Sequence, residues 1–302
     1  MSGSAALSRI FLLCLSGIFK NLPDGMYKHH VIVLLGAIPW KEMRLPAMPV
    51  DFGRNTGVKI IPHIGEADFK ALLLRNIEYE TEIYDFVESR INEYDIVIDI
   101  GANVGLFSVF CAVKLRHQGH KKVYAFEPSG EACRRLAANV EANKLENIHI
   151  VNKAVSDTNG YERLYEPKGH LSNASLNRSF AAIFDADPVC TEVPSVAAAS
   201  LAGLASPGGR VLLKIDAEGA EARILKSLEP VMNTLKPDII IEVLKPFEGE
   251  LNAVDFLLKP PYEIFNITDK GLVKQDGFAA AAGHRDFFIC RKNSSKNNTA
   301  VI

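Results

Sequence analysis

Apolar and polar residues follow two different periods along the chain between residues 58 and 292. Short apolar runs, typical of buried strands, alternate with stretches in which apolar residues recur at helical spacing. The apolar runs predict strands at residues 58–62, 96–100, 122–126, 148–155, 210–215, 237–243, 262–267 and 286–291. The helical spacing predicts helices at residues 66–77, 80–91, 104–115 and 129–140, and a further helix containing residues 224–228. This alternation is typical of an α/β fold with a doubly wound, mostly parallel sheet, whose last two strands are antiparallel.

The strand at residues 96–100 leads through a tight glycine turn into a helix. Two glycines let the backbone bend sharply and approach a ligand without a Cβ in the way. Free N–H groups at the start of the helix favour polar or anionic ligand groups. The turn lacks the Gly-x-Gly-x-x-Gly pattern of dinucleotide-binding folds. It reads instead Asp99-x-Gly101-x-Asn103-x-Gly105, which is similar to the first motif of S-adenosylmethionine-dependent methyltransferases.

Three acidic residues lie at strand ends around this turn. Glu127 ends the strand at residues 122–126, where a carboxylate can accept hydrogen bonds from both ribose hydroxyls of an adenosine. Asp157 is a candidate for adenine contact, and its alternative role is to cap the polar turn that follows it. Asp99 either binds the ammonium group of the cofactor or is a buried strand-end acid that fixes the turn.

A second acidic group lies at the ends of the next two parallel strands. Asp216 follows one strand, Glu242 ends the other, and Glu218 lies two residues beyond Asp216. Carboxylates at this edge can hold a divalent cation, or can orient a substrate hydroxyl and accept its proton. The structural alternative is that first-turn acids stabilise a helix N-terminus, which is the favoured interpretation of Glu221. Lys214, within an apolar strand, needs a carboxylate partner if it is buried.

Composition and charge narrow the class of protein. The chain has 302 residues, of which 34 are Lys or Arg and 36 are Asp or Glu, so its formal net charge is −2. Because no basic excess is available to bind phosphate backbones, a nucleic-acid substrate is not expected. The five cysteines form no Cys-x-x-Cys pair. They are typical of reduced thiols in a cytoplasmic protein, not of a zinc site or a disulfide framework.

The apolar runs near the N-terminus are shorter than a spanning helix, which needs about 18 apolar residues. We therefore interpret residues 1–57 as a helical extension that packs on the domain or on a partner. The alternative is weak contact of residues 5–40 with a membrane surface, which would make the cytoplasmic protein peripheral to that membrane. The domain itself is predicted at residues 58–292, followed by a disordered tail at residues 293–302.

Residues 161–205 show no clear period and contain a Ser/Asn-rich run. We interpret them as an edge strand and a long loop over the ligand face, where substrate contacts usually lie. His170 in this segment and His284 near the C-terminus are interpreted as surface histidines, not as bases.

Three blocks of sequence resemble the FkbM family of S-adenosylmethionine-dependent methyltransferases. They are IDIGANVG at residues 98–105, AFEPSGEACRRLAANVEAN at 125–143 with NKAVSD at 152–157, and LLKIDAEGAEARIL at 212–225. The third block is the specific one, because the first two are shared with many methyltransferases of this fold. The family pattern Lys-Ile-Asp-x-Glu-Gly-Ala-Glu is intact in it.

The resemblance implies a Rossmann-like class I methyltransferase with a doubly wound sheet of seven strands. It further implies S-adenosylmethionine as the cofactor and O-methylation of a hydroxyl on a small-molecule or glycan acceptor, such as a sugar, a glycan or a polyketide. Glu80 matches a glutamate that precedes the first strand of the fold, near the methionine end of the cofactor. One departure is that Leu201 is followed by Ala202, where the family has Leu-Asp, so no role is carried over for that Asp.

Two alternatives come from other classes of protein. One is an NAD(P)-dependent oxidoreductase, which the missing dinucleotide pattern and the longer gap from turn to acid disfavour. The other is a cofactor-binding scaffold that has lost catalysis, which the intact Asp216 and Glu218 disfavour. The sequence leaves metal dependence open.

Overall fold

The computed structural model describes residues 48–53, 56–62, 76–77, 79–206, 208–281 and 283–292. The chain divides into two compact units, one of Met1–Tyr79 with Glu141–Lys144 and one of Glu80–Val140 with Leu145–Ile302. In the first unit, a small sheet has the strand order β2-β1-β3. Its strands are β1 (Val50–Phe52), β2 (Val58–Ile60) and β3 (Asn76–Ile77). Among the described residues, no helix has the length and apolarity needed to cross a membrane.

The N-terminal expectations have mixed outcomes. The strand predicted at residues 58–62 is confirmed by β2. The helix predicted at residues 66–77 is wrong at its end, because β3 pairs there in parallel with β1, while residues 66–75 lie outside the described residues. Strand β1 falls within the extension that we expected to be helical. Residues 1–47 and the predicted tail lie outside the described residues, and the boundary at residue 57 stays a prediction.

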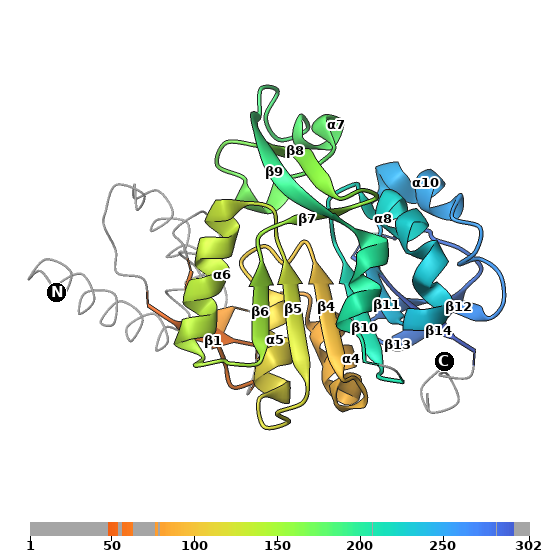
Figure 1. The fold of residues 1–302 in the computed structure, drawn as a ribbon, viewed down its shortest axis with the longest axis horizontal. Helices are drawn as coiled ribbons and strands as arrows, with labels where there is room; N and C mark the ends of the chain where they lie inside the picture. Colours follow the sequence, from red (N-terminus) through yellow and green to blue (C-terminus); the bar gives the residue numbers. More distant parts are fainter. Residues whose placement is uncertain are drawn as a thin grey trace, which may run out of the picture. The chain divides into compact units, whose positions relative to one another are not determined.

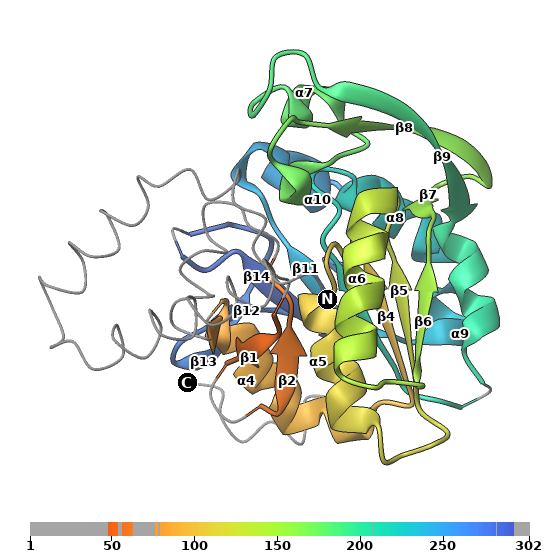
Figure 2. The same ribbon diagram turned by 90° about the vertical axis from the view of Figure 1, so that its left-hand side faces the viewer.

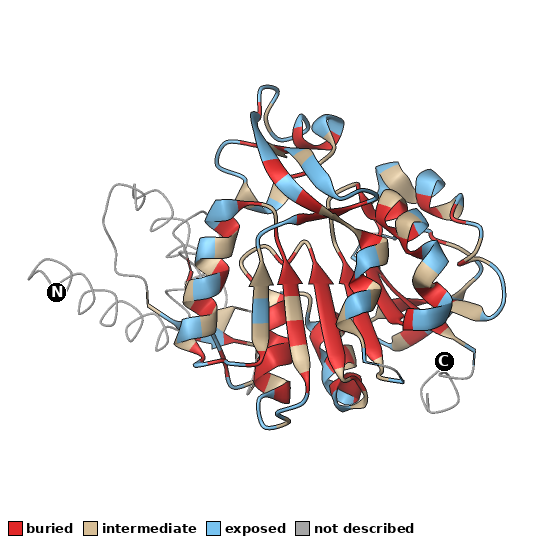
Figure 3. Cartoon of the chain, in the orientation of Figure 1, coloured by how far each residue is buried: buried red, intermediate tan, exposed pale blue. Residues whose placement is uncertain are grey.

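The main sheet has eight strands in the order β13-β12-β14-β11-β10-β4-β5-β6 (Figure 1). Its parallel strands are β4 (Ile96–Ile100), β5 (Lys122–Phe126), β6 (Ile148–Val151), β10 (Val211–Ile215) and β11 (Asp238–Glu242). The antiparallel strands are β12 (Tyr262–Thr268), β13 (Gly271–Gln275) and β14 (Asp286–Arg291). Strands β4, β10 and β11 are buried along their whole length, as expected of parallel strands covered on both faces (Figure 3).

Helices cover both faces of this sheet (Figure 2). Helices α5 (Leu106–Leu115) and α6 (Gly130–Ala142) connect β4 to β5 and β5 to β6. The connection from β10 to β11 runs in the opposite direction across the sheet, through α8 (Glu221–Leu228), η5 (Glu229–Val231) and α9 (Met232–Leu235). Because such crossovers are right-handed, reversing the direction puts these helices on the other face. The reversal occurs between β4 and β10, and ligands of such folds bind at the carboxyl ends of strands where the order reverses.

The remaining helices are short or precede the sheet. They are α4 (Thr81–Arg90) and η2 (Ile91–Glu93) before β4, and η6 (Lys245–Phe247) and α10 (Glu248–Asn252) after β11. The ring of Tyr84 in α4 packs 5.0 Å from the ring of Phe110 in α5, measured between centroids. This contact is apolar, so it fixes α4 beside the first helix of the sheet.

A third sheet lies beyond the carboxyl ends of the parallel strands (Figure 1). It has the order β7-β9-β8, with β7 (Ala154–Ser156), β8 (Gly160–Glu166) and β9 (Val189–Ala197). Between β8 and β9 lie η3 (Leu171–Asn173) and α7 (Arg178–Ala181), and η4 (Ala198–Leu204) follows β9. The segment that we interpreted as one edge strand and a loop is therefore a long hairpin that carries two short helices.

Two further strand predictions need correction. The sheet has eight strands instead of seven, because β13 adds an edge strand in which only Leu272 is buried. The strand predicted at residues 148–155 divides into β6 and β7, which belong to different sheets. The side chain of Asn152 donates hydrogen bonds to the carbonyl oxygens of Glu127 and Pro128 at 2.8 and 3.0 Å, which turns the chain away from the main sheet.

We expect Gly105→Ala to lower the free energy of unfolding by about 1–3 kcal/mol. Gly105 has a φ of 87°, and a Cβ there would lie 2.0 Å from Cδ1 of Leu136 in α6. Urea denaturation without cofactor measures this difference. Gly119→Ala is the matched control, because no atom lies within 4 Å of a Cβ at that exposed position. Equal stability of the two variants would contradict this account of the turn.

Candidate active site

The glycine turn is held against β5 and β10. The backbone N–H groups of Gly101 and Ala102 both donate to the carbonyl of Phe126 at 3.0 Å. Gly101 has a φ of 80°, and a Cβ there would lie 1.7 Å from the backbone oxygen of Asp216. We expected the glycines to leave space for a ligand, but these contacts show that they leave space for protein atoms. A substitution at Gly101 therefore displaces Asp216 and does not by itself report on cofactor binding.

Glu127 is fixed beside this turn. One carboxylate oxygen accepts from the backbone N–H of Asn103 at 2.7 Å, and the other accepts from the backbone N–H of Ser129 at 2.8 Å. Burial raises the pKa of Glu127 to about 7, although these two hydrogen bonds oppose the shift. The side-chain oxygen of Asn103 is buried without a hydrogen-bond partner. The turn and Glu127 thus present unused hydrogen-bonding capacity together, which fits a ligand with hydroxyl or amino donors.

Lys214 is buried between two carboxylates. Its Nζ lies 2.7 Å from Oδ2 of Asp216, and Lys214 pairs with Asp99 in the register of β10 and β4. Burial alone would lower the pKa of Lys214, but Asp216 and then Asp99 raise it well above its usual value. The predicted need for a carboxylate partner is confirmed, and the ammonium group stays charged.

Asp99 is directed towards this ion pair and towards α5. It is buried, and Ser108 donates to its Oδ2 at 2.5 Å, while its Oδ1 has no hydrogen-bond partner. Burial raises the pKa of Asp99, and Lys214 opposes that shift. Of the two interpretations, the geometry favours the buried strand-end acid, and contact with the cofactor's ammonium group stays a prediction.

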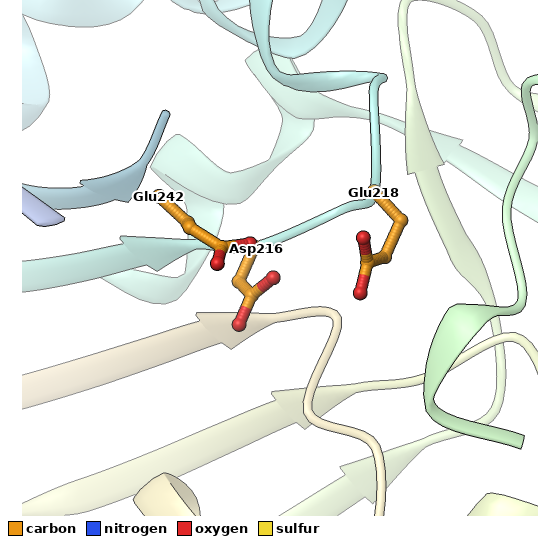
Figure 4. A group of neighbouring side chains, drawn as sticks. All are labelled: Asp216, Glu218 and Glu242. Atoms are coloured by element: carbon orange, nitrogen blue, oxygen red, sulfur yellow. The ribbon is translucent and has the colours of Figure 1, made fainter. Parts of the chain in front are cut away.

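The carboxylates of Asp216, Glu218 and Glu242 face one another (Figure 4). Each offers an oxygen, and these oxygens lie within 4.8 Å of one another. Burial, followed by the charge of Asp216, raises the pKa of Glu218 to about 8 and that of Glu242 to about 9. The structure therefore confirms that the ends of β10 and β11 bring these three residues together. Protons on the two glutamates relieve their repulsion, and Lys214 already supplies a positive charge.

The loop that carries Glu218 is fixed by Glu221. The buried carboxylate of Glu221 accepts from the backbone N–H groups of Ala217 at 2.8 Å and of Gly219 at 3.0 Å. Glu218 itself has a φ of 51°, which is unusual for a residue with a side chain. The structural interpretation of Glu221 is confirmed, because it stabilises the turn that points Glu218 into the cluster.

Two acids that the analysis treated differently lie near each other. Asp286 begins β14 and pairs in register with Glu242. Burial, followed by the charge of Glu80, raises the pKa of Asp286 to about 7. The sequence analysis missed Asp286, although its own prediction of an antiparallel last strand places the start of that strand at the carboxyl edge. Glu80 has a φ of 44° before α4, and its predicted place near the methionine end stays a prediction.

Asp157 has contacts on the other side of the sheet. Its carboxylate accepts from the hydroxyl of Ser156 at 2.9 Å and lies 3.9 Å from Nη1 of Arg223 in α8. The same guanidinium lies 3.2 Å from Glu162 in β8. These contacts give Asp157 a structural role, and its contact with adenine stays a prediction.

Comparison with known proteins places this geometry in a family. The methyltransferase FkbM domain matches residues 99–265, which is more than half of the chain. The chain is 28% identical over 193 residues to the 31-O-demethyl-FK506 methyltransferase FkbM of Streptomyces tacrolimicus, covering 55% of this chain and 71% of that protein.

Solved structures show weaker likeness. The methyltransferase FkbM from Methylobacillus flagellatus KT is 12% identical with a TM-score of 0.39, covering 79% of this chain and 56% of that one. A SAM-dependent methyltransferase from Agrobacterium tumefaciens is 9% identical with a TM-score of 0.43, covering 83% and 72%.

A doubly wound sheet with a glycine turn and a strand-end glutamate beside it defines the protein as an S-adenosylmethionine-dependent methyltransferase. The match over the three sequence blocks and beyond shows that the chain belongs to the FkbM methyltransferase family. The NAD(P)-dependent alternative is thereby set aside.

We expect Glu127→Gln to weaken binding of S-adenosylhomocysteine by about tenfold to a hundredfold, since a hydrogen bond to a charged group contributes roughly 1.5–3 kcal/mol. Isothermal titration calorimetry at pH 8 measures the affinity. Glu166→Gln is the control, because Glu166 accepts a hydrogen bond from Ser129 but is not bonded to the turn. Unchanged affinity of Glu127→Gln would remove the ribose assignment.

We expect the melting temperature to fall between pH 5.5 and 8.5, and to fall less in Glu218→Gln. The pKa of Glu218 is about 8 in the folded protein and 4.5 in its absence, so the native state holds a proton that the unfolded chain releases. The resulting stability is complete below pH 4.5 and is lost as the pH rises through 8.

Differential scanning fluorimetry in EDTA tests this slope. Glu131→Gln is the control, because the hydrogen bond from Arg134 lowers the pKa of Glu131 to about 2, outside the window. A rise in melting temperature at pH 8.5 on adding Mg²⁺, absent in Glu218→Gln, would show instead that the cluster holds a cation.

Proposed function

We propose that the protein methylates a hydroxyl oxygen of a small-molecule or glycan-type acceptor, such as a sugar, a glycan or a polyketide. The observation that carries this proposal is the contact between the glycine turn and Asp216. The backbone N–H of Asp216 donates to the carbonyl of Ile100 at 3.0 Å, and the backbone oxygen of Asp216 leaves no room for a Cβ on Gly101. A proton acceptor therefore stands beside the turn that binds the cofactor.

The name of the relative from Streptomyces tacrolimicus supports oxygen as the acceptor atom. That protein is named for methylation of 31-O-demethyl-FK506, so its acceptor is an oxygen. The cluster of this chain suits the same atom, because a hydroxyl must lose a proton when it becomes an ether. The near-neutral balance of charge gives no support to a nucleic-acid acceptor.

S-adenosylmethionine, when bound, supplies a methyl group activated by a positively charged sulfur. The residues of the chain then have to orient the acceptor, exclude water and take up one proton. Asp216 is the proton acceptor in this proposal, and Lys214, at 2.7 Å, holds its carboxylate in place. Glu218 and Glu242 have raised pKa values of about 8 and 9, so at pH 7 they carry protons and can donate hydrogen bonds to the acceptor.

We expect Asp216→Asn to lower kcat by about 10²–10⁴-fold, which is the range for loss of a general base. The affinity for S-adenosylhomocysteine should stay near that of the wild type, because Asn keeps the shape of the side chain. Transfer of tritiated methyl groups into a cell extract measures turnover, and EDTA added to the wild-type assay distinguishes a base from a metal ligand.

Asp238→Asn is the matched control for lost stability. Asp238 begins β11 at the opposite edge of the sheet and pairs with Arg210 at 3.1 Å, so its loss removes a buried ion pair without touching the site. Normal turnover in Asp216→Asn would end the assignment. Failure of the wild type to transfer any label would favour the scaffold alternative.

A further inference from the structure

A row of aromatic side chains runs from the surface to the loop that carries Glu218. The ring centroid of Phe184 lies 5.4 Å from that of Phe180, which lies 6.1 Å from that of Phe247 in η6. Phe247 packs on the loop, since a Cβ on Gly219 would lie 2.7 Å from its ring. The row therefore begins one residue from the carboxylate cluster and ends on the hairpin between β8 and β9.

The outer end of the row is apolar and open to solvent. Ile183 is 66% exposed and Phe184 is 38% exposed, whereas Phe180 is buried. A single exposed apolar residue needs no explanation. Here two neighbours continue a row that leads to the site, so a ligand lying over them would remove a continuous apolar surface from water.

This part of the hairpin is held in place by its own hydrogen bonds. The side chain of Asn177 caps α7 by accepting two backbone N–H groups at 2.9 and 3.3 Å, and Asp185 accepts two more at 3.1 and 3.0 Å. The hydroxyl of Ser175 donates to the carbonyl of Glu218 at 2.6 Å. The aromatic row is thus tied directly to the catalytic loop, and its surface is formed before a ligand arrives.

We infer that Phe180, Ile183, Phe184 and Phe247 form the binding surface for the acceptor, which we call the aromatic platform. The acceptor then carries an apolar ring or chain next to the hydroxyl that is methylated. This inference rests on the proposed function and narrows it, because a fully hydrophilic sugar would leave the outer half of the platform in water. The hydroxyl lies at the inner end, where Glu218 and Asp216 meet.

A small amphipathic molecule fits the platform better than a protein partner does. The exposed apolar part consists of two side chains, whereas a stable protein interface buries roughly 800 Å² on each partner. Continuity with the carboxylate cluster also ties this surface to the chemistry. An apolar segment bound here places the polar end of the same molecule at the cluster.

Two glycosides that differ only in their apolar part test the inference. Octyl β-glucoside, below its micelle-forming concentration, and methyl β-glucoside are titrated into the protein loaded with S-adenosylhomocysteine. We expect octyl glucoside to bind at least about tenfold more tightly, since burying two CH₂ groups is enough for this difference. The double variant Ile183→Ala/Phe184→Ala should lose the preference, because both side chains are exposed and their removal leaves the fold intact.

Tyr161→Ala is the control, since Tyr161 is 71% exposed on the same hairpin but lies in β8, outside the platform. It should keep the preference for octyl glucoside. Equal or undetectable binding of the two glycosides to the wild type overturns the inference, as does a double variant that still discriminates. Concentration-dependent dimerisation that the double variant abolishes would assign the surface to a second copy of the chain and also overturn it.

The inference and the proposed function fail in different ways. A wild-type protein that prefers octyl glucoside but transfers no methyl group contradicts the function and keeps the platform. A protein that transfers label to hydroxyl acceptors without this preference contradicts the platform alone. Asp216→Asn should keep the binding preference, because Asp216 does not belong to the platform.

Discussion

The ion pair between Lys214 and Asp216 is the constraint on which the site depends. An unpaired ammonium group in an apolar sheet costs several kcal/mol, so Lys214 requires carboxylates from two directions. Asp99 lies opposite Lys214 in the neighbouring strand, and Asp216 lies 2.7 Å from its Nζ. The pairing of β4 with β10 and the position of the proposed base are therefore fixed together. Because Gly101 contacts the backbone of Asp216, the same arrangement also fixes the cofactor turn.

The carboxyl edge of the sheet gathers acids because strands of both directions meet there. The ends of β10 and β11 bring Asp216 and Glu242, and the antiparallel start of β14 brings Asp286 opposite Glu242. Partial burial makes charge costly, so the glutamates bind protons at a pH where isolated carboxyl groups are ionised. One paired carboxylate among protonated neighbours gives an acceptor and donors of hydrogen bonds within a few ångströms. Transfer to a hydroxyl oxygen uses both.

The hairpin between β8 and β9 gives the site its outer wall. It is a separate sheet, joined to the main one by the chain turning at Asn152 and by the hydrogen bond from Ser175 to Glu218. A family that shares one cofactor site can vary its acceptor by varying such a segment. In this chain the segment presents aromatic and aliphatic side chains, which is why the acceptor is inferred to be partly apolar.

The sequence alone determined the central strands, the glycine turn, the acid at Glu127 and the family, because apolar runs and local motifs carry that information. It also predicted that Asp216, Glu218 and Glu242 share one edge, since the carboxyl ends of parallel strands do. Only the tertiary structure decided the rest. Strands β3, β9 and β13 form through hydrogen bonds to partners distant in sequence, so their own residues show no clear period. Asp286 and the aromatic platform joined the site for the same reason: they reach it by pairing and packing between segments far apart in the chain.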